Sequence, residues 1–186
     1  MSSFEIDRWE EVRGGVLVKM EPVPFTPHQT ITHNIYDALR NSLSNKNCKV
    51  YGSGVGVNLT INDNFVPDIM IIKDLTIIKS NGIEGVPDFI AEVVNPISEE
   101  ADRGYKKEIY EKSGVKEYWI VTPETKSIEI YHLNSGKFRL NRICRIYDES
   151  FFNVISNEER KVIETEQNIN LKIFENIQIS ITDIFV

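Results

Sequence analysis

Two apolar runs constrain the fold of this chain more than any other feature of its sequence. Residues Phe65–Ile72 and Phe89–Val94 are apolar at nearly every position, which predicts short strands buried on both faces. Each run nevertheless contains one carboxylate, Asp68 in the first and Glu92 in the second. Because a carboxylate removed from water needs a partner that compensates its charge, both positions are candidates for a functional site.

The segment before these runs is predicted to be a helix. Thr26 and Pro27 are typical of a helix start, and apolar residues recur at helical spacing after them. The predicted buried stripe consists of Ile31, Ile35, Ala38, Leu39 and Leu43. His28 lies on the same stripe, where a lone histidine is consistent with a structural role or with a place in the site.

Residues 98–113 form a second predicted helix, with Ser98 as its cap. Lys106 falls on the inward side of this helix, which would bring the lysine back toward the strand that carries Glu92. A surface salt bridge between Asp102 and Lys106, four residues apart, is the alternative interpretation and would contribute about 0.3–0.5 kcal/mol.

Strand-like segments predominate around and after the two helices. Further strands are expected at residues 15–20, 50–51, 55–61, 117–121, 127–131 and 137–142, with a last strand and a closing segment in 173–184. Some links are too short for parallel crossovers, so the order predicts an α/β fold with a mixed central β-sheet flanked by helices. A single domain, 1–186, accounts for this length, and the polar residues 148–170 are interpreted as an inserted segment.

Composition excludes several classes of protein. The hydrophobic fraction of 41% is too high for a disordered chain, and no run approaches the roughly 20 apolar residues of a membrane span, so we expect a cytoplasmic protein without a membrane partner. Cys48 and Cys144 lack the spacing of a zinc site. The formal charge of −7 argues against nonspecific coating of nucleic acid. Two basic clusters are either phosphate contacts or solvated faces: Arg103, Lys106, Lys107, Lys112 and Lys116, then Lys137, Arg139, Arg142 and Arg145.

Asp68 and Glu92 on neighbouring strands predict a divalent-metal site. Mg²⁺ prefers oxygen ligands and typically takes one or two carboxylates from the protein, and the Val93 carbonyl could supply a third ligand. Lys106 could position the attacking water or offset charge that develops on a phosphate. Each carboxylate alone could instead be solvated or cap a turn.

The order of these residues resembles that of a known family. The resemblance rests on Pro67-Asp68, on Glu92-Val93-Val94-Asn95-Pro96, on Asp102 with Lys106 and Tyr110, and on Gly114-Val115-Lys116-Glu117-Tyr118-Trp119-Ile120-Val121. This pattern is similar to the Uma-two family of endonucleases, in the restriction-endonuclease-like superfamily that is known for its PD-(D/E)-x-K motif. The similarity extends from about Trp9 to Ile184-Phe185.

The resemblance implies a restriction-endonuclease-like core and cleavage of nucleic acid, with DNA as the expected substrate, by water activated by Mg²⁺ or Mn²⁺. Asp68 and Glu92 are the implied metal ligands. The superfamily motif has lysine two residues after Glu92, where this chain has Val94. The resemblance therefore implies that Lys106 on the following helix is the catalytic lysine.

The resemblance also implies which residues line the site. His28 matches a family position on the first helix, and the spacing of Asp102 and Tyr110 about the lysine fits the family pattern. Restriction-like nucleases often pair to cut two strands, so a homodimer is a further expectation.

Two other functions stay open at this stage. The fold could serve as a catalytically inactive module that binds nucleic acid or protein, or the chain could act on a different phosphate ester. The absence of a helix-turn-helix or zinc-finger motif argues against tight, sequence-specific DNA binding by this chain alone.

Overall fold

The structure is a computed structural model that describes residues 10–19, 26–165 and 167–186. Within these residues, six strands form a central sheet in the order β12-β11-β10-β9-β6-β3. They are β3 (Lys49–Gly52), β6 (Ile69–Ile72), β9 (Phe89–Val93), β10 (Glu117–Thr122), β11 (Ser127–Asn134) and β12 (Lys137–Arg145). The pair β9–β10 is parallel and the other neighbours are antiparallel. The predicted mixed sheet is therefore confirmed.

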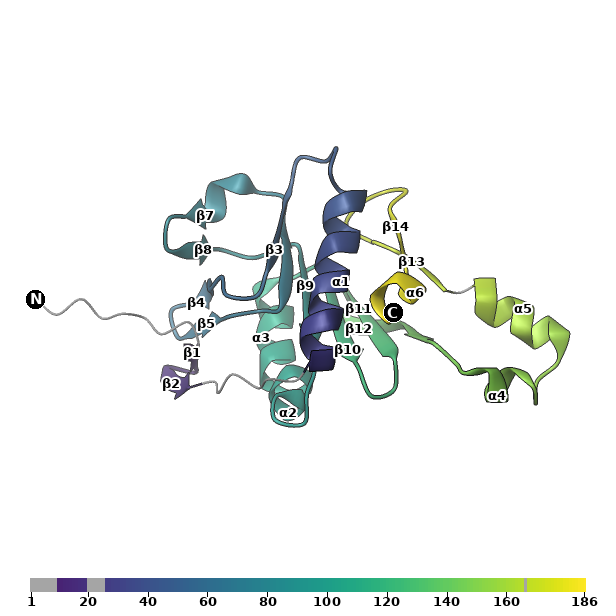
Figure 1. The fold of residues 1–186 in the computed structure, drawn as a ribbon. Coiled ribbons are helices and arrows are strands. Elements are labelled where there is room, and N and C mark those ends of the chain that lie inside the picture. The colour runs from purple at the N-terminus through teal and green to yellow at the C-terminus, as the bar shows by residue number, and fades with distance from the viewer. Residues whose placement is uncertain (1–9, 20–25, 166) are drawn as a thin grey trace, which may run out of the picture.

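Helices cover both faces of the central sheet, as Figure 1 shows. Helix α1 (Thr26–Ser42) packs on one face with the short helix α6 (Ile181–Ile184), and α3 (Tyr105–Ser113) packs on the other. Along β6, Ile69 and Ile71 contact the α1 side while Met70 and Ile72 contact the α3 side. This two-sided burial explains why the strand is apolar at every position.

A second sheet lies beside the first, in the order β2-β1-β5-β4-β8-β7. It consists of β1 (Glu10–Arg13), β2 (Val16–Lys19), β4 (Val57–Thr60), β5 (Asp63–Phe65), β7 (Ile78–Lys79) and β8 (Gly82–Glu84), and the 3-10 helix η1 (Leu75–Ile77) precedes β7. Only a single mixed sheet was expected from the sequence. Strands of two to four residues are too short to show a reliable alternation of apolar and polar positions.

The apolar pattern predicted a single strand over Phe65–Ile72, but the structure divides this run between two strands. Strand β5 ends at Phe65 in the second sheet, and β6 begins at Ile69 in the central sheet. Pro67 lies between them and has no backbone N–H for a strand ladder. The link 66–68 therefore carries the chain from one sheet to the other, and Asp68 stands at its end.

The predicted helix over 98–113 is divided into α2 (Glu99–Arg103) and α3 at Gly104. A Cβ atom at Gly104 would lie 2.8 Å from the Glu100 carbonyl oxygen, so this break requires glycine. The predicted cap is also wrong, because the Ser98 hydroxyl makes no cap bond and instead accepts a hydrogen bond from the Asn95 N–H.

The C-terminal part differs most from the expectation. Residues 148–170 contain helices α4 (Glu149–Phe152) and α5 (Asn157–Thr165), which Figure 1 shows set apart from the two sheets, and strand β13 (Asn168–Asn170). Strand β13 pairs with β14 (Gln178–Ser180), and α6 follows it, so that the last strand and closing segment expected in 173–184 correspond to β14 and α6. No helix among the described residues is long and apolar enough to cross a membrane.

Candidate active site

Glu92 lies within β9, where it points toward α3. Its neighbours Ile90 and Val94 contact the α3 side of the sheet, and the alternation of strand residues places Glu92 on that side as well. Only 2% of the residue is exposed. One carboxylate oxygen, Oε1, accepts a hydrogen bond from the Tyr110 hydroxyl at 2.7 Å and lies 3.1 Å from the Lys106 ammonium.

Lys106 is buried on the inward side of α3, with 3% of the residue exposed. Its ammonium lies 3.0 Å from Glu11, 3.1 Å from Glu92 and 3.2 Å from Asp102. The i,i+4 pair with Asp102 therefore exists, but it is buried rather than on the surface. Three carboxylates share one ammonium, so negative charge exceeds positive charge around the lysine.

Asp68 lies directly before β6, opposite Glu92 on β9. Its Oδ2 accepts a hydrogen bond from the Val93 N–H at 2.9 Å, while its own N–H donates to Glu92 Oε2 at 3.2 Å. The two residues are thus joined by reciprocal bonds between side chain and backbone. The Asp68 side chain keeps 17% of its surface exposed, against 3% for Glu92, so solvent reaches the site from the Asp68 side.

His28, in the first turns of α1, contacts this open side of the site. Its Nε2 lies 3.2 Å from Asp68 Oδ2, and the ring also makes a hydrogen bond to the backbone of Val93. That second bond raises the pKa of the ring, so the ring donates it to the carbonyl oxygen. His28 therefore touches two of the three predicted metal ligands.

Glu11 is a buried member of the site that the sequence did not indicate. It comes from β1 of the second sheet and is fully buried. Strand β1 contains charged residues at three of its four positions, so its hydropathy gives no sign of a buried strand. We refer to Glu11, Asp68, Glu92 and Asp102, together with Lys106, as the carboxylate cluster.

The charges in the carboxylate cluster shift one another's pKa values. Burial raises the pKa of Glu92 to about 8, although the positive charge of Lys106 opposes the shift. Burial likewise raises the pKa of Asp102. These two carboxyls interact, so a proton retained at neutral pH belongs to the pair rather than to either residue alone.

The same surroundings also raise the pKa of Lys106, which favours the charged form of the lysine rather than the neutral form. Burial by itself would lower its pKa, but the negative charges of Glu92, Asp102 and Glu11 outweigh burial and raise the pKa. The lysine therefore stays protonated at neutral pH. It can offset negative charge on a reacting group, but it cannot accept a proton as a base.

His28 also gains positive character from its surroundings. Burial would lower its pKa, but the hydrogen bond to Asp68 and the charge of that carboxylate outweigh burial and raise it. These surroundings thus favour the protonated form of the imidazole on the exposed side of Asp68.

The oxygen donors of the cluster suit a hard divalent cation in their chemistry, and their negative charge exceeds that of the cations beside them. In the arrangement described, however, the oxygens of Glu11, Asp68 and Glu92 accept hydrogen bonds from the protein, while Asp102 Oδ1 is buried with only the ion pair to the lysine as a partner among the described residues. Among residues 10–19, 26–165 and 167–186, no group of three or more His, Cys, Asp or Glu side chains is placed to hold a metal ion.

The first predicted basic cluster is largely neutralised by the protein itself. Arg103 contacts Glu99 and Glu129, Lys112 contacts Glu108, Lys116 contacts Asp88, and Lys107 lies over the ring of Tyr131. With Lys106 inside the carboxylate cluster, each of its five members has a partner. A continuous phosphate-binding patch is therefore not formed by these residues.

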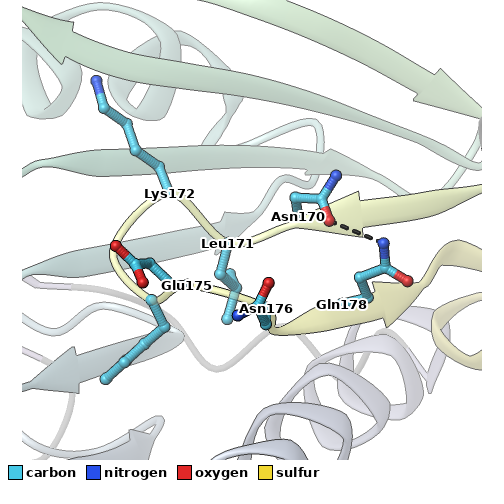
Figure 2. A pocket seen from close by; sticks show the side chains of 7 residues that line it. Asn170, Leu171, Lys172, Glu175, Asn176 and Gln178 are labelled. Atoms are coloured by element: carbon cyan, nitrogen blue, oxygen red, sulfur yellow. Dashed lines mark hydrogen bonds between the residues drawn. The ribbon is translucent and has the colours of Figure 1, made fainter.

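A separate hollow of about 610 Å³ lies at the turn between β13 and β14. Figure 2 shows the polar side chains around it, with Gln178 donating a hydrogen bond to Asn170 at 2.9 Å. Its lining consists of Asn170, Leu171, Lys172, Phe174, Glu175, Asn176 and Gln178. These residues do not include any member of the carboxylate cluster, so this hollow is not part of the candidate active site.

Comparisons with known proteins agree with this fold. A family model described as "Uma2: Putative restriction endonuclease" matches residues 4–156. The "Uncharacterized protein slr1290" of Synechocystis sp. is 26% identical over 109 residues, which make up 58% of this chain and 57% of that protein. The chain thus spans less than two thirds of that curated relative.

A solved structure resembles the chain over nearly its whole length. It is the crystal structure of "a putative nuclease belonging to DUF820" from Anabaena variabilis, with a TM-score of 0.69 at 15% sequence identity. The match covers 95% of this chain and 89% of that one. At this identity the likeness shows a shared fold alone.

Proposed function

The chain belongs to the Uma2 family, and on that basis we propose that it is a divalent-metal-dependent nuclease that hydrolyses phosphodiester bonds in nucleic acid, with DNA as the expected substrate. The observation that supports this proposal most directly is the contact between Lys106 and Glu92, with Asp68 bonded to Glu92 on the solvent side. An ammonium beside carboxylates at an accessible sheet position matches the needs of phosphoryl chemistry.

Asp68 and Glu92 would hold Mg²⁺ or Mn²⁺, with the Val93 carbonyl as a third oxygen. The shortage of positive charge supports this assignment, because the raised pKa of Glu92 reflects a buried carboxyl that its lysine does not fully compensate. The bound ion would supply Lewis acidity, which polarises a phosphate and lowers the pKa of water.

The remaining side chains have roles that follow from their contacts. Lys106 offsets negative charge that develops on the phosphate. Tyr110 donates its hydroxyl to Glu92 and so orients that carboxylate. Asp102 lies on α2, before the break at Gly104, and contacts the Lys106 ammonium from there. His28 lies on the accessible side, where its bonds to Asp68 and to the Val93 backbone would orient two of the metal ligands.

One site of this kind cuts one strand, so we also propose that two copies act together on duplex DNA. The mass in solution, measured by light scattering with and without DNA, tests this part separately from catalysis.

The nuclease proposal is tested with supercoiled plasmid and purified protein in Mg²⁺ or Mn²⁺. Cleavage is expected from the wild type and is expected to be lost in Asp68→Asn, Glu92→Gln and Lys106→Met, each of which changes charge with little change in volume. Glu117→Gln is a matched control, because Glu117 is also a fully buried strand carboxylate but bonds to Trp119 and Lys172 instead.

Other outcomes would redirect the assignment. An inert wild type that still binds DNA would favour an inactive binding module. Hydrolysis of small phosphate esters without cleavage of DNA or RNA would favour a different phosphoesterase.

A further inference from the structure

Glu11 connects the second sheet to the candidate active site. Its Oε1 lies 3.0 Å from the Lys106 ammonium and also accepts a hydrogen bond from the Val66 N–H at 3.0 Å. Val66 is two residues before Asp68, in the link between the two sheets. A single carboxylate oxygen thus contacts both the lysine and the segment that leads to Asp68.

The other oxygen of Glu11 is fixed from the opposite direction. Arg13 donates to Oε2 from Nε at 3.0 Å and from Nη2 at 2.7 Å. Strand β1 in turn pairs with β2 over four residues and with β5 at Val12 and Asn64. The Glu11 carboxylate therefore has little freedom to follow a displaced lysine, and it acts as a fixed reference point.

The start of α3 is held by the same sheet through a second carboxylate. Asp63 Oδ1 accepts the Gly14 N–H at 2.9 Å and the Tyr105 hydroxyl at 2.7 Å. Tyr105 directly precedes Lys106 and directly follows the break at Gly104. The second sheet thus restrains the first turn of α3 at two adjacent residues. Tyr105 is held outside the site by Asp63, and Lys106 is held inside it by Glu11.

We propose that Glu11 is a positioning residue for the nuclease reaction: it holds the Lys106 ammonium and the Val66–Asp68 link in one fixed relation, so that lysine and Asp68 face the same phosphate. This inference rests on the proposed function. Asp102 cannot replace Glu11 in this role, because Asp102 lies on the adjoining helical segment and would move with the lysine. Displacement of a catalytic group by about 1 Å can reduce a rate by about 100-fold.

The competing explanation is that Glu11 only stabilises the fold. Glu117 separates the two explanations, because it too is fully buried in a strand and accepts a backbone N–H from a distant segment, that of Lys172 at 2.8 Å. Glu117 contacts Trp119 and Lys172 instead of Lys106. Glu11→Gln and Glu117→Gln therefore remove comparable buried charges, but only the first touches the lysine.

The experiment combines cleavage kinetics with a readout that does not need activity. With ¹⁵N-lysine-labelled protein, the Lys106 ammonium is observed directly by ¹H–¹⁵N NMR and assigned by its loss in Lys106→Met. Steady-state cleavage of DNA gives kcat and KM for the wild type, Glu11→Gln, Glu11→Asp and Glu117→Gln. Circular dichroism spectra identify variants that fold.

The expected result is that Glu11→Gln lowers kcat by about 100-fold with KM unchanged, and shifts or broadens the Lys106 signal. Glu11→Asp keeps the charge and should recover most of kcat, while Glu117→Gln leaves both readouts as in the wild type. The inference is overturned if Glu11→Gln leaves kcat and the ammonium signal unchanged, or if Glu117→Gln changes them equally. A wild type without cleavage would defeat the proposed function, and the ammonium signal would then decide by itself whether Glu11 holds Lys106.

Discussion

Replacement of Lys106 by methionine should destabilise the protein in a way that depends strongly on pH. The substitution keeps most of the side-chain volume and removes the ammonium that lies 3.0–3.2 Å from Glu11, Glu92 and Asp102. Removal of one partner from a buried ion pair costs about 3–5 kcal/mol, because the remaining charge stays buried without compensation. We expect a loss of this size at about pH 9, where Glu92 of the folded wild type is mostly ionised.

The loss should become smaller at lower pH, because protons can replace the ammonium. Without Lys106 the pKa of Glu92 rises further above its value of about 8, so above about pH 8 the folded variant binds more protons than the folded wild type. The unfolded wild type and the unfolded variant contain the same titratable groups, apart from residue 106 itself. The stability difference therefore grows with rising pH, by about 1.4 kcal/mol per pH unit for each additional proton.

Urea unfolding, followed by the fluorescence of the buried Trp119, measures this difference at about pH 7 and about pH 9 in the absence of divalent cations. Lys112→Met is the matched control, because Lys112 forms an exposed i,i+4 pair with Glu108 on the same helix. Such a pair contributes only about 0.3–0.5 kcal/mol. A loss in Lys106→Met that is no larger than the control, or that is equal at both pH values, would refute the charge argument.

Three further predictions follow from the same contacts. Because the pKa of Glu92 is raised from 4.5 to about 8 in the folded protein, its contribution to stability is complete below about pH 4.5 and is lost as pH rises through about 8; urea unfolding across this range should show a weaker pH dependence in Glu92→Gln. Gly104→Ala should destabilise by about 1–3 kcal/mol in thermal unfolding, since its Cβ would lie 2.8 Å from the Glu100 carbonyl oxygen, and unchanged stability would show that the break tolerates a side chain. Mg²⁺ at 100 times its Kd should stabilise the wild type by about 2.7 kcal/mol but not Asp68→Asn, and an equal effect on both would place the ion elsewhere.

The inner strands of the central sheet could be predicted from the sequence because they are buried on both faces. Apart from Glu92 and Glu117, residues 89–93 and 117–121 are apolar or aromatic regardless of which side they face, so no knowledge of their neighbours is needed to identify them. The second sheet has the opposite character, with polar strands of two to four residues whose pairing depends on distant partners. Glu11 was missed for that reason, because its burial is created by α3 and by the link after β5.

The sequence predicted which side of the second helix faces the site, but it did not predict that this helix is broken into two. Lys106 and Tyr110 share the inward side of α3, as their spacing of four residues requires. The same periodicity continues through Asp102, which conceals the break at Gly104. Only the contact of that glycine with the Glu100 carbonyl, a feature of the folded backbone, shows that the two segments are separate helices.

The break between α2 and α3 has a consequence for how the site assembles. Asp68 and Glu92 are joined as soon as β6 pairs with β9, because their bonds run between those two strands. The ammonium arrives only when α3 docks, and Val94, directly after β9, fills the position where a lysine borne by the strand end would stand. The carboxylates and the lysine therefore belong to units that can open separately. If α3 detaches locally, the chain keeps its oxygen donors but loses the ammonium, so hydrogen exchange of the α3 amides should report the fraction of molecules in which the site is fully assembled.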